Sequence, residues 1–291
     1  MRTGKALIDE IDATELGDGE LAFWWLGQHG FVLKMGGAVV YLDPYLSENP
    51  SRTVRPLVAP EQVAHADLIT GSHDHSDHID RPVWPVLAEA SPAATFVVPQ
   101  CLLDRGLARQ LGIPAERFVG VDDGTVAEIA GVRVIGVPAA HERLDADERT
   151  GLHPYMGYVL EAAGCRVYHA GDTCRYEGLQ TRLQQLAPFD AMFLPINGRD
   201  ARRLAGGCIG NMTYQEAVDL AGEVAPRLAV AAHFEMFANN REDPAKFVEY
   251  MAVKFPSVPT LVPEHGRRVV LRKPGRSAGA ADDRDVASCD V

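Results

Sequence analysis

The sequence contains few cysteines, and their spacing follows no pairing pattern. Five occur in 291 residues, none of them in a C-x-x-C pair: Cys101, Cys165, Cys174, Cys208 and Cys289. An odd number at irregular intervals predicts no disulfide framework, and proteins of reducing compartments characteristically lack one. We therefore expect a cytoplasmic protein with free thiols, in which Cys174 packs as a small apolar side chain.

Long apolar segments are also missing. A membrane-spanning helix needs about 18 or more consecutive apolar residues, and no run of that length occurs. Residues 1–20 are polar and acidic and lack the apolar stretch that a secretory signal requires. The sequence therefore predicts no membrane span and no export.

Positive charge is scarce, because the chain has 28 Lys and Arg residues but 40 Asp and Glu residues, for a net charge of -12. A nucleic-acid partner would need a basic surface, so we expect none. A small anionic substrate stays compatible, because a few arginines or metal ions can override the overall field locally. The glycine-rich patterns of nucleotide-binding folds are absent too. The expected partner is a small-molecule substrate, and a homo-oligomer is left open.

Apolar segments rich in β-branched and aromatic residues recur along the chain. In the first half they flank turns at residues 28–30 and 36–37, and in the second half they form hairpins around 130–131 and 163–164. Further strands are expected at residues 67–70, 96–99, 190–196 and 227–233, with a last hairpin over 260–271.

Helix signals lie between these strands. Residues 81–90 follow Asp80, a candidate N-cap, and residues 101–112 read as one helix that ends at a glycine. Thr213 and Glu216 form a capping box before a third helix, and residues 244–255 form a fourth. Strand groups with interspersed helices predict an α/β fold, a four-layer sandwich of two mixed sheets flanked by helices.

We expect one domain over residues 1–273. The remaining segment, residues 274–291, is small, polar and acidic, and its composition predicts a disordered tail.

The most informative segment runs from Gly71 to Asp80. Within it His73, His75, Asp77 and His78 follow a buried strand closely enough to converge from one loop. His73 and His75 can meet on one cation, and Asp77 with His78 on another. Imidazole and carboxylate ligands suit Zn, Mn or Fe(II). The alternative is a solvated polar loop, but dense His/Asp tracts are themselves typical of metal sites.

The segment from His73 to His78 resembles the signature of a known protein family. H-x-H-x-D-H after a hydrophobic strand is the signature of hydrolases with the metallo-β-lactamase fold, and further segments resemble the L-ascorbate-6-phosphate lactonase branch. Those segments span Phe23 to Pro244 and read FWWLGQHGFVLK, YLDPYL, HDHSDHID, YHAGDT, NMTYQEA and AHFEMFANNREDP. The resemblance implies the αββα sandwich and a two-metal hydrolytic site.

The resemblance also implies the remaining ligands. His141 matches the third histidine of the first site, Asp172 the bridging carboxylate, and His233 the last histidine of the second site. Asp43 matches an aspartate that orients a ligand histidine from behind. Each has a plainer interpretation, as a histidine at a strand end or an aspartate in a turn.

Two divalent transition-metal ions, Zn²⁺ or Mn²⁺ with Fe²⁺ as a further option, are therefore the expected cofactors. Asp77 and Asp172 are the expected catalytic residues, because the ions and the bridging carboxylate together generate a hydroxide near neutral pH. The implied substrate is a lactone of a phosphorylated sugar acid. Here the segment between Asp43 and His73 is shorter than in the lactonase, which bears on the substrate.

Other polar residues are weaker candidates. Arg199 and Arg202, in a glycine-bearing loop, with Asn211 and His153, are candidate substrate contacts. The charged loop 142–152 is expected to pack little and to form a mobile rim. Three further histidines are expected to be structural: His65 at the surface, His169 in the core or behind the ligands, and His265 in a turn. His29 also lies in a turn, where lining the pocket mouth is the less favoured of its two interpretations.

Two alternatives stay open. The same site would serve a metal-dependent phosphodiesterase acting on a small or lipid phosphodiester. A metal-binding domain with a vestigial site is the non-enzymatic alternative, and its mark would be lost ligands, whereas every expected ligand is present.

Overall fold

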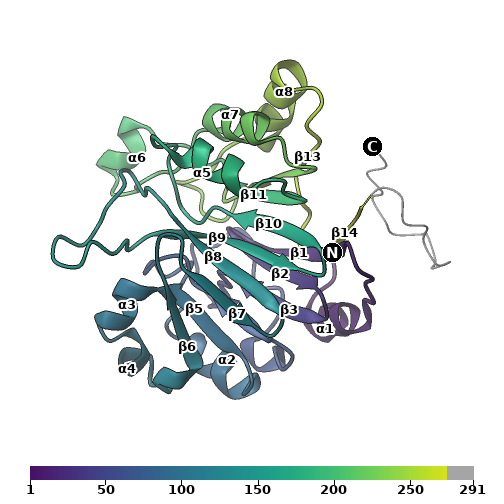
Figure 1. Ribbon diagram of the computed structural model, residues 1–291, viewed down its shortest axis with the longest axis vertical. Helices are drawn as coiled ribbons and strands as arrows, with labels where there is room; N and C mark the ends of the chain where they lie inside the picture. The colour runs from purple at the N-terminus through teal and green to yellow at the C-terminus, as the bar shows by residue number, and fades with distance from the viewer. Residues whose placement is uncertain (274–291) are drawn as a thin grey trace.

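The computed structural model describes residues 1–273, so the predicted tail 274–291 and Cys289 lie outside the described residues. Within the described part, two seven-stranded sheets stack face to face, and helices cover the outer face of each (Figure 1). The predicted four-layer α/β sandwich is confirmed.

The first sheet has the strand order β14-β1-β2-β3-β4-β5-β6. An antiparallel meander continues into parallel strands from β3 onward. Its strands are β1 (Glu20–Gly27), β2 (Gly30–Met35), β3 (Ala38–Leu42), β4 (Leu68–Thr70), β5 (Thr95–Pro99), β6 (Phe118–Val121) and β14 (Arg268–Arg272). Its helices are α1 (Gly4–Ala13), α2 (Trp84–Ala90), α3 (Gln100–Asp104) and α4 (Leu107–Leu111), with short 3₁₀ turns at Pro60–Gln62 and Ala115–Arg117.

The second sheet has the order β13-β12-β11-β10-β9-β8-β7 and is likewise mixed. Its strands are β7 (Val126–Ile129), β8 (Val132–Pro138), β9 (Met156–Ala162), β10 (Cys165–His169), β11 (Ala191–Pro195), β12 (Ala229–Ala232) and β13 (Thr260–Leu261). Its helices are α5 (Leu179–Leu186), α6 (Ala201–Ala205), α7 (Tyr214–Val224) and α8 (Pro244–Lys254).

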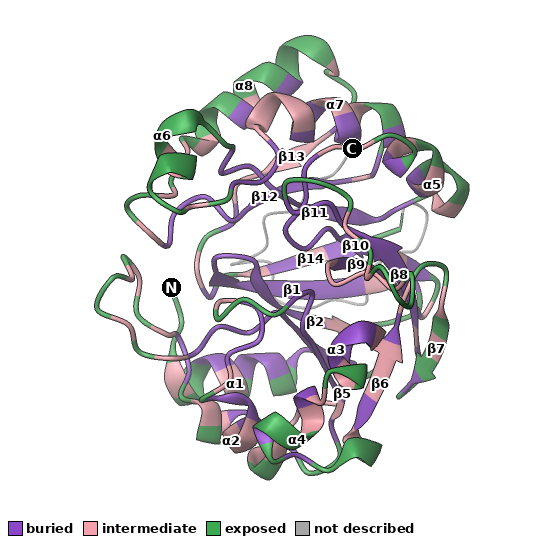
Figure 2. Cartoon of the chain, turned by 90° about the vertical axis from the view of Figure 1, so that its left-hand side faces the viewer, coloured by how far each residue is buried: buried purple, intermediate pink, exposed green. Residues whose placement is uncertain are grey.

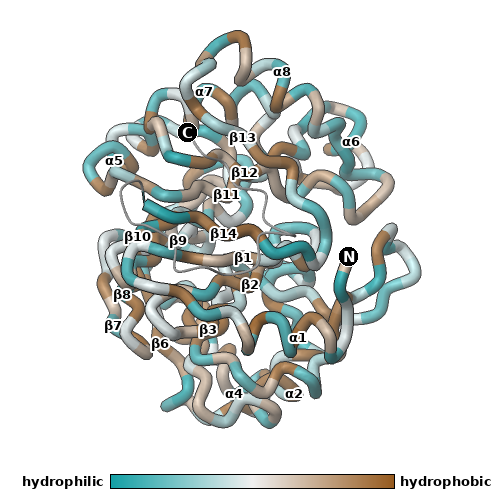
Figure 3. Tube along the Cα trace, turned by 90° about the vertical axis from the view of Figure 1, so that its right-hand side faces the viewer, coloured by the Kyte–Doolittle hydropathy of each residue, from teal (hydrophilic) through white to brown (hydrophobic). Residues whose placement is uncertain are grey.

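Both faces of the central strands are buried, which explains why they are almost continuously apolar. On β1, Phe23 packs toward the second sheet, where its ring lies 5.1 Å from that of Phe193. Its neighbour Trp24 belongs to the separate core beneath the first layer of helices. Figure 2 shows this buried centre and the more exposed helices, and Figure 3 shows hydrophobic residues along the central strands.

The predicted turns are present with the expected backbone. Ala130 and Gly131, like Ala163 and Gly164, have positive φ angles and close the hairpins β7–β8 and β9–β10. Thr213 and Glu216 form the predicted capping box of α7. No helix within residues 1–273 is long and apolar enough to cross a membrane.

The last predicted hairpin is wrong. β13 pairs with β12 in the second sheet, whereas β14 pairs with β1 in the first. The two strands are adjacent in sequence, but β13 runs parallel to β12 and β14 runs antiparallel to β1. The connection between them therefore crosses from one sheet to the other.

Two helix boundaries also differ from the sequence prediction. The segment 101–112 divides into α3 and α4 at Gly106, whose φ of 84° interrupts the helix. Helix α2 begins at Trp84 rather than at 81, because the Asp80 carboxylate is engaged elsewhere. It accepts hydrogen bonds from the backbone N–H groups of Leu46 and Ser47 and from the Ser47 hydroxyl, and so does not cap the helix.

Candidate metal centre

The predicted ligands all follow strands that end at one edge of the sandwich. In the first sheet Asp43 follows β3, and the His73–His78 segment follows β4, which is parallel to β3. In the second sheet His141, Asp172 and His233 follow β8, β10 and β12. Gly171 positions Asp172, since its φ is +59° and a Cβ there would lie 2.5 Å from the Met156 carbonyl oxygen.

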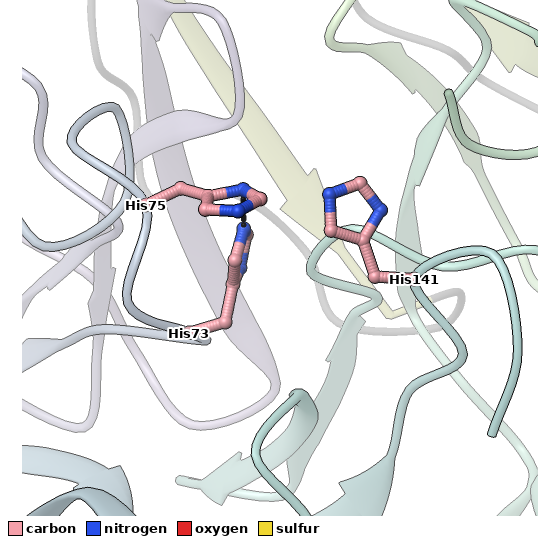
Figure 4. A group of neighbouring side chains, drawn as sticks. All are labelled: His73, His75 and His141. Atoms are coloured by element: carbon pink, nitrogen blue, oxygen red, sulfur yellow. Dashed lines mark hydrogen bonds between the residues drawn. The ribbon is translucent and has the colours of Figure 1, made fainter. Parts of the chain in front are cut away.

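The first group of donors consists of His73, His75 and His141, whose ligand atoms lie within 4.8 Å of one another (Figure 4). His73 Nε2 lies 2.9 Å from His75 Nδ1, and the His141 ring faces both from the second sheet. Three imidazole nitrogens that converge in this way are a suitable set for a transition metal.

The second group consists of Asp77, His78 and His233, and Asp172 lies between the two groups. Asp77 Oδ2 is 3.7 Å from both His78 Nε2 and His233 Nε2. Asp172 Oδ1 is 3.4 Å and 3.2 Å from the same two nitrogens, and its Oδ2 is 4.0 Å from His141 Nε2.

These separations match a metal site. Ligands about 2.0–2.1 Å from a tetrahedral ion are about 3.3 Å from each other. His78 Nε2 and Asp172 Oδ1 are buried and have no hydrogen-bond partner within residues 1–273. Buried polar atoms are normally paired, so this arrangement fits the cations that the donor set implies. The two Asp172 oxygens face different groups, as a bridging carboxylate requires.

Electrostatics divide the histidines into two kinds. Burial lowers the pKa of His73 well below its ordinary value and that of His141 to about 4, which favours the neutral form that a metal ligand requires. Burial also opposes charge on His78, but the carboxylates of Asp172 and Asp77 outweigh it and raise the pKa of His78. Asp172 correspondingly has a pKa well below its ordinary value, because His233 and His78 outweigh its burial.

Asp43 lies directly behind the second group. Its Oδ2 is 2.6 Å from His78 Nδ1, and it also accepts hydrogen bonds from the Ser72 backbone N–H and hydroxyl. A carboxylate at the far ring nitrogen fixes the orientation and tautomer of a histidine, so that Nε2 points into the site. This is the placement expected from the sequence.

Two residues of the turn between β1 and β2 reach the centre: Gln28, which was not predicted there, and His29, for which lining the pocket mouth was the less favoured interpretation. The Gln28 side-chain amide lies 2.7 Å from Asp77 Oδ2, and His29 Nδ1 lies 3.9 Å from Asp172 Oδ1. Both are buried. The sequence feature that could have identified them is their position inside FWWLGQHGFVLK. A glutamine in a turn, however, is not by itself typical of a metal site.

Tyr155 is the other unpredicted neighbour. Its ring centroid is 5.4 Å from that of His73 and 5.3 Å from that of His141. With His75, Arg81 and Arg105 it lines a pocket of about 150 Å³ beside the first group.

Three of the four predicted substrate contacts are engaged within the protein. Arg199 pairs with both carboxylate oxygens of Glu216, and His153 Nδ1 lies 2.9 Å from Asp122. Asn211 is buried and donates to the side chain of Asn197. Arg202 differs, because it is exposed and lines a pocket of about 470 Å³.

The loop 142–152 is exposed as expected, and it makes several hydrogen bonds of its own. Asp147 accepts hydrogen bonds from the backbone N–H groups of Arg149 and Thr150 and pairs with Arg105 at 2.9 Å. The loop is therefore tied to the end of α3, next to the pocket that contains His75.

The remaining predictions on single residues vary in outcome. Cys174 is buried, as predicted, and His169 is buried with Nε2 2.9 Å from the His29 carbonyl oxygen. His265 stacks on Trp25 at 4.1 Å. His65 is not a free surface residue, because it lies between the Tyr41 hydroxyl and Asp12 and is largely covered.

Comparison with known proteins agrees with this geometry. Residues 39–234 match the model of the Beta-lactamase superfamily domain. A UPF0173 metal-dependent hydrolase of Thermofilum pendens is 30% identical over 230 residues, covering 77% of this chain and 88% of that protein. One from Archaeoglobus fulgidus is 29% identical over 256 residues, 87% of this chain and 96% of the other. The structure of Igni18, a metallo hydrolase from Ignicoccus hospitalis, has a TM-score of 0.68 at 22% identity and covers 87% of this chain and 99% of that one.

Proposed function

This chain belongs to the UPF0173 metal-dependent hydrolases of the beta-lactamase superfamily, and from that premise we propose that it opens a lactone ring with two transition-metal ions in the cytoplasm. Residues 1–273 would act as one hydrolase unit. The proposed substrate class is the cyclic ester of a sugar acid that carries an anionic group, which follows from the resemblance to the lactonases.

One observation carries the two-ion proposal. His73, His75 and His141 form one donor group, Asp77, His78 and His233 form another, and Asp172 offers one oxygen to each side. A single ion would occupy only one of these two groups, and the other group would keep its converging donor atoms without a cation. Two ions would satisfy both groups.

The ions, when bound, would lower the pKa of a shared water and polarise the scissile carbonyl. The chain supplies the rest. Asp172 and Asp77 hold negative charge at the centre, and Asp77 can also accept the proton of the attacking hydroxide. Asp43 keeps the His78 ring in place through its 2.6 Å contact. Ring opening cleaves the bond between the carbonyl carbon and the ring oxygen, and the alkoxide, which stays on the product, would take up the proton that Asp77 accepted from the hydroxide.

A positively charged pocket supports an anionic group on the substrate. Arg202, Arg203 and Arg241 line it together with one acidic residue, Asp200. Arg203 is engaged by Asp200 and by backbone carbonyl oxygens. The guanidinium groups of Arg202 and Arg241 make no hydrogen bond or ion pair within residues 1–273. Their planar donors suit a phosphate or carboxylate.

This pocket is connected to the candidate centre along the chain. Its lining residues Ala238, Asn239 and Arg241 follow His233, and Asn240 accepts a hydrogen bond from Asn197, which follows β11. The pocket is thus lined by chain segments that follow His233 and β11.

A substrate panel tests the proposed reaction. Protein reconstituted with Mn²⁺ or Zn²⁺ would be assayed against phosphorylated and unphosphorylated sugar lactones and against small and lipid phosphodiesters. We expect kcat/KM for the best lactone to exceed that for the best phosphodiester by about 100-fold, or roughly 2.7 kcal/mol of transition-state discrimination. The reverse order would favour the phosphodiesterase, and no hydrolysis by the metal-loaded protein would favour the vestigial site.

Loss of the bridging carboxylate should remove most of the activity. Asp172→Ala should lower kcat by about 10³-fold or more, because both ions and the shared nucleophile depend on it. Asp190→Ala is the matched control, since Asp190 is equally buried but precedes β11, at the end opposite the site. Steady-state kinetics on the best substrate measure both; an Asp172→Ala variant that kept more than about a tenth of wild-type turnover would exclude the bridging role.

A further inference from the structure

The side chain of Gln28 touches two proposed ligands of one metal ion. It lies in the turn between β1 and β2 and is only 2% exposed. Its amide nitrogen is 2.7 Å from Asp77 Oδ2 and 3.1 Å from His233 Nε2. Both atoms belong to the second donor group, which His78 completes. The amide therefore lies at the second group itself and not merely behind it.

The Gln28 backbone is held rigidly. Its N–H donates to Glu235 at 3.0 Å, and its carbonyl oxygen accepts from the His233 N–H at 2.9 Å and from the Trp25 indole at 3.1 Å. Its φ is +54°, a conformation that non-glycine residues adopt only when their surroundings hold them there. The turn thus holds the Gln28 side-chain amide beside Asp77 and His233.

The amide occupies the space beside the same atoms that a cation would bind. Its NH₂ group donates to Asp77 Oδ2 and lies 3.1 Å from His233 Nε2, so it competes with an ion for both atoms. The nitrogen and oxygen ends of a glutamine amide have the same shape, and rotation about its last torsion exchanges them at little cost. With an ion between Asp77 and His233, the favourable orientation presents the oxygen.

Resting on the proposed two-ion centre, we propose that Gln28 is a further ligand of the second ion, through its amide oxygen. Its separations of 2.7 Å and 3.1 Å from Asp77 and His233 are close to the roughly 3.3 Å expected between neighbouring ligands. Asp77 and His233 hold it on two sides, and Asp172 and His78 complete the set.

This ligand would make the two sites chemically different. The first has three imidazoles and one Asp172 oxygen, a set that suits four-coordinate Zn²⁺. The second would have three oxygens, from Asp77, Asp172 and Gln28, and two imidazoles, from His78 and His233. More ligands and more oxygen shift the preference toward Mn²⁺ or Fe²⁺, relative to the first site. We therefore expect Gln28 to set the metal preference of the second site.

Two substitutions separate a ligand from a hydrogen-bond donor. Gln28→Leu keeps the size of the side chain and removes its polar atoms. Gln28→Glu keeps an oxygen that can bind a cation but cannot donate to Asp77, beside which it would place a second negative charge. Gln185→Glu is the control for added charge, because Gln185 is exposed on α5. Metal-stripped proteins would be titrated with Mn²⁺, with free Mn²⁺ followed by electron paramagnetic resonance and bound metal by elemental analysis.

We expect wild type and Gln185→Glu to bind two ions. Gln28→Leu should bind the second ion about 10- to 100-fold more weakly, and Gln28→Glu at least as tightly as wild type. A Gln28→Glu protein that loses the second ion as Gln28→Leu does would overturn the ligand role and make Gln28 a donor to Asp77. If Gln28→Leu bound the second ion as tightly as wild type, Gln28 would have no role in binding that ion.

The outcomes also separate this inference from the proposed function. Wild type that binds fewer than two ions would contradict the two-ion centre and Gln28 with it. Two ions with the expected variant pattern, but no lactone hydrolysis, would uphold Gln28 and contradict the proposed substrate. Thermal unfolding of the metal-free proteins checks that each variant folds, and if Gln28→Leu does not, the opposite expectations for Gln28→Glu still decide.

Discussion

Three residues at the candidate centre have left-handed backbones although none is glycine: Gln28 (φ 54°), Asp43 (φ 42°) and His233 (φ 56°). Each such residue costs of the order of 1–3 kcal/mol and persists where the surroundings over-determine it. Here hydrogen bonds to Glu235, Ser72 and the Gln28 carbonyl oxygen supply that constraint. Local strain therefore lies at the ligands and at the residues that orient them.

A substitution at Asp43 tests the orientation of the His78 ring without removing a metal ligand. Asp43→Asn should keep the backbone, because asparagine tolerates positive φ. It should weaken metal binding by about 10- to 100-fold, since an amide cannot hold the His78 Nδ1–H as a carboxylate does. Chelator competition measures the affinity. Asp67→Asn is the control, because Asp67 accepts a backbone N–H in the same sheet, away from the ligands; equal losses in both variants would contradict an orienting role.

Single residues also show what could be predicted from sequence. The spacing of His73, His75, Asp77 and His78 pointed to a shared site, because a metal needs several close donors of specific chemistry. The pairing of Arg199 could not be predicted in this way, since its carboxylate partner Glu216 lies on α7 and only folding brings them together. Gln28 escaped notice because its importance depends on contacts 49 and 205 residues away along the chain.

At the scale of elements, local patterns predicted hairpins and caps but not long-range pairing. Turns such as Ala130-Gly131 are determined by residues next to one another. β13 and β14 have the same kind of local pattern, yet they belong to different sheets. Their positions depend on the strands with which they pair, β12 and β1, and not on the turn between them. Gly106 similarly breaks a helix whose apolar spacing is continuous on both sides.

The loop 142–152 connects the site to its surroundings. It leaves His141, and Asp147 ties it to Arg105, which lines the pocket beside His75. Replacing residues 144–148 with a Gly-Ser linker should leave metal content unchanged and alter KM or substrate preference, because the pocket wall changes and the ligands do not. Asp147→Asn, which weakens the tie alone, should shift KM in the same direction. Kinetic constants that stay the same across the substrate panel would leave the loop without a functional role.

At the scale of the whole molecule, the candidate centre spans the two sheets. His73, His75, Asp77 and His78 come from the first sheet, whereas His141, Asp172 and His233 come from the second. The ligand set exists only while both sheets are packed together, so metal ions would bind the folded chain in preference to the unfolded one.

Metal should therefore stabilise the fold as a whole. At a free metal concentration 100 times the dissociation constant, one ion adds about 2.7 kcal/mol to the free energy of unfolding. For a chain of this size that raises Tm by roughly 5–10 °C. Calorimetry of metal-loaded and chelated protein measures the shift, with His141→Ala as the variant that should show a smaller one. A Tm that does not respond to metal in wild type would contradict a site built across the two sheets.

The central claim is that two ions bind on either side of Asp172. Anomalous diffraction from crystals loaded with Mn²⁺ or Zn²⁺, collected at the absorption edge of that metal, tests it directly. Two peaks are expected in each chain, one among His73, His75 and His141 and one among Asp77, His78 and His233, with an Asp172 oxygen toward each. A single peak, or peaks away from these side chains, would contradict the two-ion account.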